Sequence, residues 1–278
     1  MSLFDRPVLM WVTDRKQSDA PLPELAAPIS AAGVDVIQFR EPGLDRLPAE
    51  LLVRSIRSVV RTSTAIVVNA NLELARKLGV GVHLPEAGPT IDEARALLGS
   101  GAFLGRSVHS PDSAASSEGA SYLIAGHVFE TESKKGRSPM GLDRLAEIVR
   151  SSPAPVLAIG GITPDRVSAV MNQGAAGVAV MSPLTDLATA EATTAAFRFA
   201  LEQSMSEPTV ATITATINGK PVELPSGTTV AAFLAGRELH ERLVVVERNG
   251  EIIKRSTFPT IIVEEGDLLE IVHFVGGG

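Results

Sequence analysis

Histidines close three of the short apolar runs in the first part of the chain. His83, His109 and His127 each stand at the end of such a run. Histidine titrates near neutral pH, so a histidine at the end of a strand can shuttle protons, or it can be a packed and hydrogen-bonded residue. Three imidazoles can also bind zinc, but no H-x-H or H-x-x-x-H spacing supports this, so no metal site is predicted.

Polar side chains recur at the ends of the other apolar runs, whereas the middles of the runs are apolar. The predicted substrate-binding residues are Gln38, Arg40, Asn69, His83, Ser107, His109, Thr131 and Lys134. Arg40 can clamp a carboxylate or a phosphate, or it can pair with Glu41 or another carboxylate. The charge of Lys134, in the loop after His127, fits an anion-capturing lid or a solvated loop.

Two turns near residues 160 and 182 have the residue types of an anion site. Gly160 and Gly161 allow close backbone approach, and residues 163–165 (Thr-Pro-Asp) have the order of a helix N-cap, N1 and N2. Residues 181–183 (Met-Ser-Pro) begin the next helix in the same way. Helix N-termini either hold a phosphate or are simply well capped. The predicted phosphate-binding residues are Gly160, Gly161, Met181 and Ser182.

A repeating order of elements positions these residues. Between residues 1 and 203, apolar runs rich in β-branched residues each precede an amphipathic stretch. The predicted strands are 8–13, 34–40, 65–69, 80–84, 103–108, 122–128, 156–161 and 177–181. The predicted helices are 23–32, 47–61, 72–78, 91–98, 112–117, 142–150, 165–173 and 184–203.

This alternation predicts an α/β fold. Near-continuous apolar strands between helices indicate a parallel sheet that is covered on both faces. Eight such units favour a closed TIM (β/α)8 barrel, in which catalytic residues lie at the carboxyl ends of the strands. An open doubly wound sheet is the alternative, but no G-x-G-x-x-G follows the first strand.

The composition changes after residue 203. Residues 204–208 are polar, end in proline and are predicted to link the barrel, residues 1–203, to a second domain, residues 209–278. In that domain, two Asn-Gly pairs are typical of hairpin turns, a helical pattern covers 228–239, and 268–275 is predicted as the last strand. This order predicts a small ubiquitin-like β-grasp α+β fold with an exposed tail, Gly276, Gly277 and Gly278.

Composition excludes several classes of protein. The chain has no cysteine, which excludes disulfides, thiolate metal sites and a cysteine nucleophile. Its net charge of −7 argues against non-specific binding to nucleic acid or to an anionic membrane. No apolar run is long enough to span a bilayer and no signal-peptide pattern opens the chain, so a cytoplasmic protein is expected. The sequence leaves open whether the protein forms a homo-oligomer.

The motifs of the first domain resemble those of the thiamine-phosphate-synthase superfamily. The matching stretches are 38–41 (Q-F-R-E), 81–84 (G-V-H-L), 107–110 (S-V-H-S), 126–131 (G-H-V-F-E-T) with Lys134, 158–162 (A-I-G-G-I) and 177–181 (G-V-A-V-M). They occur in the same order as in the family and cover almost all of residues 8–200.

Departures from the family pattern indicate which branch the barrel resembles. The synthases carry an Asp after the third strand, which helps to bind Mg²⁺, and a second Asp after the fourth strand. Here the third strand is followed by Asn69-Ala70-Asn71, and after the fourth only Glu86 can substitute. The synthases have Gly-Pro at the end of the sixth strand, where this chain has Gly126-His127, as in the thiazole tautomerase (TenI-like) branch.

Resemblance to this branch implies an isomerisation without metal or cofactor. A non-aromatic dihydro tautomer of a thiazole phosphate carboxylate would become aromatic. His127 would be the catalytic residue, taking a proton from ring carbon C2 and delivering one to the exocyclic carbon. Arg40 would orient the carboxylate, Lys134 would close over an anionic group, and the predicted phosphate-binding residues would seat the phosphate.

The second domain resembles the sulfur-carrier proteins of thiazole biosynthesis (ThiS-like). The matching stretches are 217–220 (I-N-G-K), 245–253 (V-V-E-R-N-G-E-I-I), 265–267 (E-G-D) and 270–278 (E-I-V-H-F-V-G-G-G). The resemblance implies that an E1-like adenylating enzyme uses ATP to activate the carboxylate of Gly278. The resulting thiocarboxylate would donate its sulfur to thiazole synthase.

Three other interpretations stay open. The barrel can be a Mg²⁺-dependent thiamine-phosphate synthase fused to a sulfur carrier, or a non-catalytic scaffold that presents the carrier. His109 and His83 are the other candidate bases. The tail can also donate sulfur to a different acceptor, such as molybdopterin or tRNA.

Overall fold

The chain divides into two compact units, Met1–Met205 and Ser206–Gly278. A computed structural model describes residues 3–131, 134, 136–205, 212–237, 239 and 244–273. The division falls inside the predicted linker 204–208, most of which lies outside the described residues. The tail Gly276–Gly278 also lies outside them, so its exposure stays a prediction.

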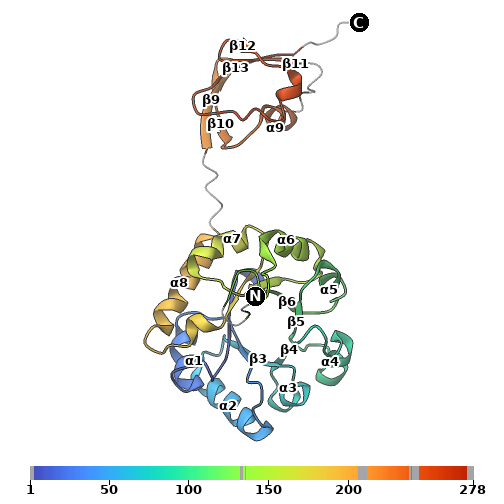
Figure 1. The fold of residues 1–278 in the computed structure, drawn as a ribbon, viewed down its shortest axis with the longest axis vertical. Helices are drawn as coiled ribbons and strands as arrows, with labels where there is room; N and C mark the ends of the chain where they lie inside the picture. The colour runs from blue at the N-terminus through green and yellow to red at the C-terminus, as the bar shows by residue number, and fades with distance from the viewer. Residues whose placement is uncertain are drawn as a thin grey trace. The chain divides into compact units, whose positions relative to one another are not determined.

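Eight parallel strands form a closed barrel in the larger unit (Figure 1). They are β1 (Val8–Val12), β2 (Val36–Phe39), β3 (Ala65–Asn69), β4 (Gly81–Leu84), β5 (Leu104–Val108), β6 (Tyr122–Gly126), β7 (Val156–Ile159) and β8 (Gly177–Val180). The strands follow chain order around the barrel, and β8 pairs with β1 to close it. The predicted TIM-like barrel is therefore confirmed.

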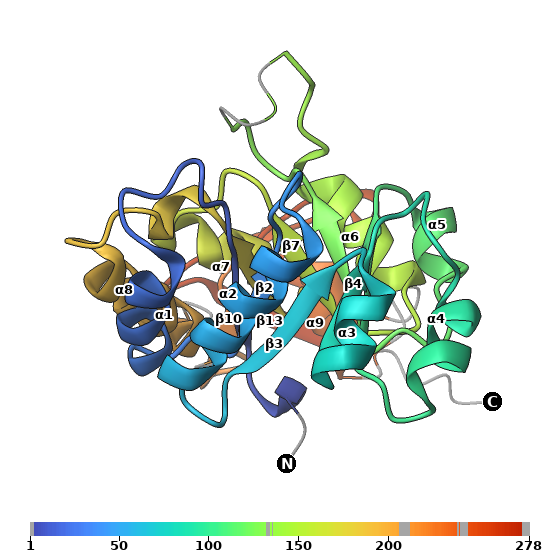
Figure 2. The ribbon, with the colours of Figure 1, turned by 90° about the horizontal axis from the view of Figure 1, so that it is seen from below.

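Helices surround the barrel (Figure 2). They are α1 (Leu22–Ala31), α2 (Arg46–Val59), α3 (Leu72–Leu78), α4 (Ile91–Leu98), α5 (Pro111–Ala115), α6 (Gly141–Ser151), α7 (Val167–Met171) and α8 (Ala190–Gln203). The predicted helix 184–203 was too long at its start, because Asp186 forms a local turn in which its Oδ1 accepts from the Ala188 N–H at 2.9 Å. The predicted helix 165–173 is a 3₁₀ turn, Pro164–Arg166, followed by the short α7.

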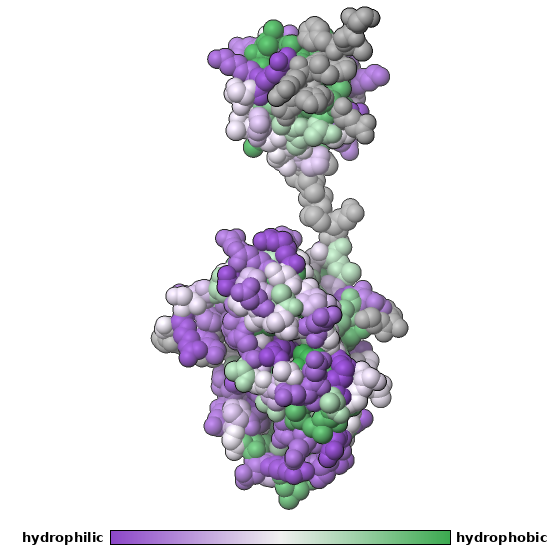
Figure 3. Space-filling view, turned by 90° about the vertical axis from the view of Figure 1, so that its right-hand side faces the viewer, coloured by the Kyte–Doolittle hydropathy of each residue, from purple (hydrophilic) through white to green (hydrophobic). Residues whose placement is uncertain are grey.

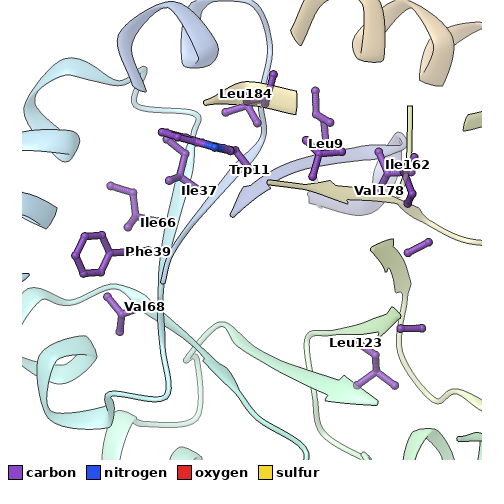
Figure 4. Packing of buried hydrophobic residues seen from close by; sticks show 14 of the residues in the cluster. Leu9, Trp11, Ile37, Phe39, Ile66, Val68, Leu123, Ile162, Val178 and Leu184 are labelled. Atoms are coloured by element: carbon purple, nitrogen blue, oxygen red, sulfur yellow. The ribbon is translucent and has the colours of Figure 1, made fainter. Parts of the chain in front are cut away.

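Alternate strand residues face the barrel axis and the helices. Trp11 of β1 and Ile37 of β2 are register neighbours and lie side by side in the outer core (Figure 4). The interior is filled by a second cluster that includes Met10, Tyr122 and Leu157. The barrel is therefore a packed core rather than a pore, and ligand chemistry is confined to the rim where the strands end.

The smaller unit is a five-stranded sheet with one helix. Its elements are β9 (Thr212–Ile217), β10 (Lys220–Pro225), α9 (Val230–Gly236), β11 (Val244–Arg248), β12 (Glu251–Ile252) and β13 (Leu268–His273). The strand order is β10-β9-β13-β11-β12, with β13 parallel to β9, which is the predicted β-grasp arrangement. The strand after the second Asn-Gly turn, β12, is only two residues long, because the chain turns at Arg255–Thr257 and buries Phe258 completely.

Polar and charged residues dominate the surface of the larger unit on the face shown in Figure 3. The exposed large apolar side chains of its helices include Leu47, Leu51 and Phe199. Among the described residues, no helix is long and apolar enough to cross a membrane. The apolar content of the chain is therefore accounted for mainly by the buried clusters of the two units.

Candidate active site

A cavity of about 930 Å³ opens at the carboxyl ends of the barrel strands. It brings together every barrel residue that the sequence pattern singled out. These residues are Gln38, Arg40, Asn69, His83, Ser107, His109, His127, Thr131, Lys134, Gly160, Gly161, Met181 and Ser182. The structure thus places the predicted residues around one space, whereas the role of each stays a prediction.

Asp14 and Gln17 also line the cavity, and the sequence analysis missed them. Both lie in the loop after β1, and the Gln17 Nε2 donates to Asp14 Oδ2 at 2.6 Å. Asp14 directly follows the predicted first strand, 8–13, so its place at a polar strand end is the signal that identifies it.

Two amides from neighbouring strands form a pair in the cavity wall. The Gln38 Nε2 donates to Asn69 Oδ1 at 3.0 Å. Gln38 is only 3% exposed, and its Oε1 has no hydrogen-bond partner among the described residues. A buried acceptor without a partner is unfavourable, so this oxygen is suited to accept a hydrogen bond from a bound ligand.

Arg40 has a fixed backbone and an available guanidinium. Its N–H donates to Thr13 Oγ1 at 3.0 Å, and the Thr13 hydroxyl donates to Glu41 Oε1 at 2.6 Å. Glu41 also accepts from the backbone N–H of Arg15 and pairs with its guanidinium. The alternative of an Arg40–Glu41 pair is therefore wrong, and no described residue bonds the guanidinium of Arg40, which can receive an anion.

His83 is buried and both of its ring nitrogens are engaged. Nδ1 lies 3.2 Å from the Tyr122 hydroxyl, and Nε2 lies 2.8 Å from Ser107 Oγ. Burial lowers the pKa of His83 to about 3, because the charged imidazolium would lose its hydration. The ring is therefore neutral near pH 7 and is poorly suited to take a proton from a ligand.

His109 forms a dyad with Glu86 at the cavity rim. The His109 Nδ1 lies 2.7 Å from Glu86 Oε2, and its backbone N–H donates to Glu86 Oε1 at 3.2 Å. Partial burial raises the pKa of Glu86, but hydrogen bonds from Ser113 and His109 outweigh it and hold the pKa below its usual value. Glu86 stays ionised near neutral pH and orients the imidazole, as carboxylates do in catalytic dyads.

His127 directly follows β6 and is half-buried in the cavity wall. Its Nε2 lies 3.2 Å from the carbonyl oxygen of Arg137. A carbonyl only accepts, so Nε2 carries the proton in this bond and Nδ1 keeps a basic lone pair. The backbone is held as well, because the Met140 N–H donates to the His127 carbonyl at 2.9 Å. The loop between β6 and α6, which includes Arg137, projects from the barrel rim in Figure 2.

Gly160 and Gly161 make room for the chain around His127. Both have positive φ, +102° and +63°. A methyl group at Gly160 would overlap the Cβ of His127, and one at Gly161 would overlap the carbonyl oxygen of Glu130. The glycine pair therefore seats the segment that carries His127, a role that the sequence pattern did not predict.

The two turns of the predicted phosphate site are shorter than expected. Residues Pro164–Arg166 and Ser182–Leu184 are single 3₁₀ turns, and neither Thr163 nor Met181 makes a side-chain cap. Pro164–Arg166 continues into α7, whereas Ser182–Leu184 does not continue into a helix, so a contribution from aligned helix peptides stays a prediction for the first turn only. The backbone N–H groups of Gly161 and Ser182 donate to no described residue and can still bind an anion.

A sequence profile described as "Thiamine monophosphate synthase" matches residues 9–184, which is more than half of the chain. The chain belongs to the thiamine monophosphate synthase family. A second profile, "ThiS family", matches residues 210–278. The barrel is therefore the synthase-family domain of this protein, and the smaller unit is a ThiS domain.

Members of the thiamine monophosphate synthase family resemble the barrel throughout. A thiamine-phosphate synthase of Salinibacter ruber is 37% identical over 196 residues, which cover 69% of this chain and 86% of that protein. The "Thiamine biosynthesis bifunctional protein ThiM/ThiE" of Symbiobacterium thermophilum is 38% identical over 59% of this chain and 35% of that protein. The solved thiamine phosphate pyrophosphorylase of Pyrococcus furiosus is 27% identical with a TM-score of 0.65, and the match covers 74% of this chain and 100% of that one.

A magnesium ion needs hard oxygen ligands, and neither of the two positions compared in the sequence analysis offers an unpaired carboxylate. Asn71 Oδ1 accepts from the Leu74 N–H at 2.9 Å and thereby caps α3. Glu86, the only predicted substitute for the second Asp, is committed to His109. Within the described ranges, no three His, Asp or Glu residues are grouped to hold an ion. Mg²⁺ can be held by one or two carboxylates together with substrate phosphates, and the carboxylates of the described cavity lining are Asp14 and Glu86.

Proposed function

We propose that the barrel is a thiazole tautomerase and that the ThiS domain carries sulfur for thiazole formation. The two family assignments place the chain in thiamine biosynthesis. The observation that carries the tautomerase proposal is His127, a half-buried histidine with a basic Nδ1 in the cavity wall. Among the described residues of that wall, no three His, Asp or Glu side chains are grouped to hold a metal ion. Such a pocket is suited to proton transfer rather than to metal-assisted displacement of diphosphate.

The reaction needs one proton acceptor that becomes a proton donor. Nδ1 of His127 takes the proton from ring carbon C2 of the dihydro thiazole, and the electrons of that C–H bond enter the ring. The imidazolium then returns the proton to the exocyclic carbon, so no proton is gained or lost overall. The bond from Nε2 to the Arg137 carbonyl stabilises the cationic ring between the two steps.

Cationic and amide groups orient the substrate. The guanidinium of Arg40, which lines the cavity, would bind the carboxylate with two parallel hydrogen bonds. Lys134 and Arg137 line the same cavity from the β6–α6 loop and can neutralise the phosphate, together with the N–H groups of Gly161 and Ser182. Aromatisation supplies the driving force, so the protein contributes mainly position and proton transfer.

The ThiS domain implies an E1-like adenylating enzyme and thiazole synthase as partners. The adenylating enzyme would consume ATP to activate the carboxylate of Gly278, and no cofactor is proposed for the barrel. In the sequence, the tail Gly276–Gly278 follows β13 after two residues, and it lies outside the described residues. A tail without side chains suits entry into partner active sites.

Thiamine-phosphate synthase activity is the second candidate, because the relative from Salinibacter ruber carries that name. It would require Mg²⁺ at a pocket in which Glu86 is paired with His109 and Asp14 accepts from Gln17. Magnesium dependence therefore separates the two candidates.

The decisive experiment mixes the purified full chain with the dihydro thiazole carboxylate phosphate and follows aromatisation by ultraviolet absorbance. His127→Ala is expected to lower the rate by roughly 10²–10⁴-fold, the usual loss of a general acid–base group. His109→Ala tests the other candidate base of the cavity rim and is expected to lower the rate less than His127→Ala does. An equal rate in His127→Ala would argue for another base or for a scaffold.

The same preparation is then assayed for coupling of the pyrimidine diphosphate to the thiazole phosphate, with Mg²⁺ and with a chelator. Product that appears only with Mg²⁺, together with no aromatisation of the dihydro substrate, would overturn the tautomerase proposal in favour of the synthase.

A further inference from the structure

Tyr122 reaches across a neighbouring strand to meet His83. His83 of β4 is the register partner of Gly105 of β5, and Gly105 is the partner of Tyr122 of β6. A methyl group at Gly105 would overlap the Tyr122 ring. Because Gly105 has no side chain, the ring of Tyr122 crosses β5, stacks on His83 with centroids 5.6 Å apart, and places its hydroxyl 3.2 Å from Nδ1.

The hydroxyl of Tyr122 has one hydrogen-bond partner among the described residues, His83. Tyr122 is fully buried, so bulk water does not reach this hydroxyl. Burial raises the pKa of Tyr122, so the phenol keeps its proton. Burial lowers the pKa of His83 to about 3, so its ring is neutral and has one donor nitrogen and one acceptor nitrogen.

Two proton arrangements fit these distances. In the first, Tyr122 donates to Nδ1, Nε2–H donates to Ser107 Oγ, and the Ser107 proton is free to face the cavity. In the second, Nδ1–H donates to Tyr122, Ser107 donates to Nε2, and Ser107 offers only lone pairs to a ligand. The second leaves the buried Tyr122 proton without an acceptor among the described residues, which is unfavourable.

We infer that Tyr122 is a positioning residue that fixes His83 as the Nε2–H tautomer and so makes Ser107 a hydrogen-bond donor to an anionic oxygen of the ligand. Each group then donates a hydrogen bond to the next: Tyr122 donates to His83, His83 donates to Ser107, and Ser107 donates to the ligand in the cavity. The identity of that ligand, a thiazole phosphate carboxylate, rests on the proposed function, whereas the tautomer of His83 does not.

Nitrogen NMR on the ¹⁵N-histidine-labelled full chain tests the tautomer directly. The His83 signals are assigned by their loss in His83→Gln. The expected result is a pyridine-like Nδ1 and a pyrrole-like Nε2 that do not titrate between pH 5 and pH 8. A pyrrole-like Nδ1 would overturn the inference, and so would an imidazolium. Because this readout needs no substrate, its failure is distinguishable from failure of the tautomerase proposal.

A double-mutant cycle tests the effect on the ligand. Tyr122→Phe and Ser107→Ala are each expected to weaken binding of the aromatic thiazole phosphate carboxylate by about tenfold, and the double variant by no more than either alone. Phe103→Leu is the packing control, because Phe103 stacks on Tyr122 at 5.1 Å without a hydrogen bond, and it should leave binding unchanged. Additive losses, or an equal loss in Phe103→Leu, would contradict a role through hydrogen-bond polarity.

Discussion

His83 and His127 stand at the ends of strands in the same barrel and line the same cavity, yet their surroundings differ. His83 lies in the wall of β4 and β5, is 2% exposed, and has both nitrogens bonded to buried or half-buried hydroxyls. His127 lies at the rim, where one nitrogen bonds a backbone carbonyl and the other is available. The contrast teaches that a strand-end position brings a histidine to the site, while burial and partners decide whether it can exchange protons.

The largest expected difference between the two positions is in stability. His83→Ala removes a buried ring and leaves the hydroxyl of Tyr122 without its partner, so the free energy of unfolding should fall by about 2–4 kcal/mol. His127→Ala removes a half-buried side chain and should cost less than about 1 kcal/mol. Urea unfolding of both variants measures the difference. Equal losses of unfolding free energy would show that His83 is no more important for stability than His127.

The dependence of stability on pH gives a second comparison between His83 and His127. The pKa of His83 is about 3 in the native chain and near 6.5 in an unfolded one. Below pH 6.5 the unfolded chain binds a proton that native His83 does not, so stability is lost as the pH falls from 6.5 toward 3. By pH 5 the free energy of unfolding should have fallen by roughly 2 kcal/mol from its value at neutral pH through this one group.

Urea unfolding at pH 7 and pH 5 checks this expectation. The difference between the two values should shrink in His83→Gln and should persist in His127→Ala. A wild-type chain that is equally stable at both pH values would show that His83 is not buried as a neutral ring.

The smallest effect concerns the third histidine. Glu86→Gln keeps the shape of the side chain but removes the charge that orients His109. The pair is largely exposed, so stability should change by no more than about 0.5 kcal/mol. The rate of aromatisation should fall less than tenfold, since His127 keeps its own contacts. A loss as large as that of His127→Ala would make the dyad the catalytic pair.

Periodicity was enough to predict the barrel, because each buried strand is a short apolar run that a helix follows. The same reasoning gathered the site residues, since the carboxyl ends of parallel strands meet at one rim. Contacts between strands were not predictable in this way. The Tyr122–His83 hydrogen bond depends on the absence of a side chain at Gly105. The Glu86–His109 pair depends on a loop that brings Glu86 to His109.

Local chemistry also overrode the pattern at the turns. The sequence order at 163–165 and 181–183 fits helix starts, but both segments close as 3₁₀ turns, and Asp186 delays α8 through a bond to the chain that follows it. Helix propensity is a weak preference, so one side-chain bond to the backbone is enough to shift a boundary.

Gly160 has a consequence for engineering. The backbone and Cβ of His127 occupy the space that any side chain at Gly160 would need. The carbonyl oxygen of Glu130 occupies the corresponding space at Gly161. Transplanting the histidine into another barrel of this family would therefore require its strand-seven glycines to travel with it. A graft of His127 alone onto a barrel with larger residues there would displace the imidazole from the position that it has in this cavity wall.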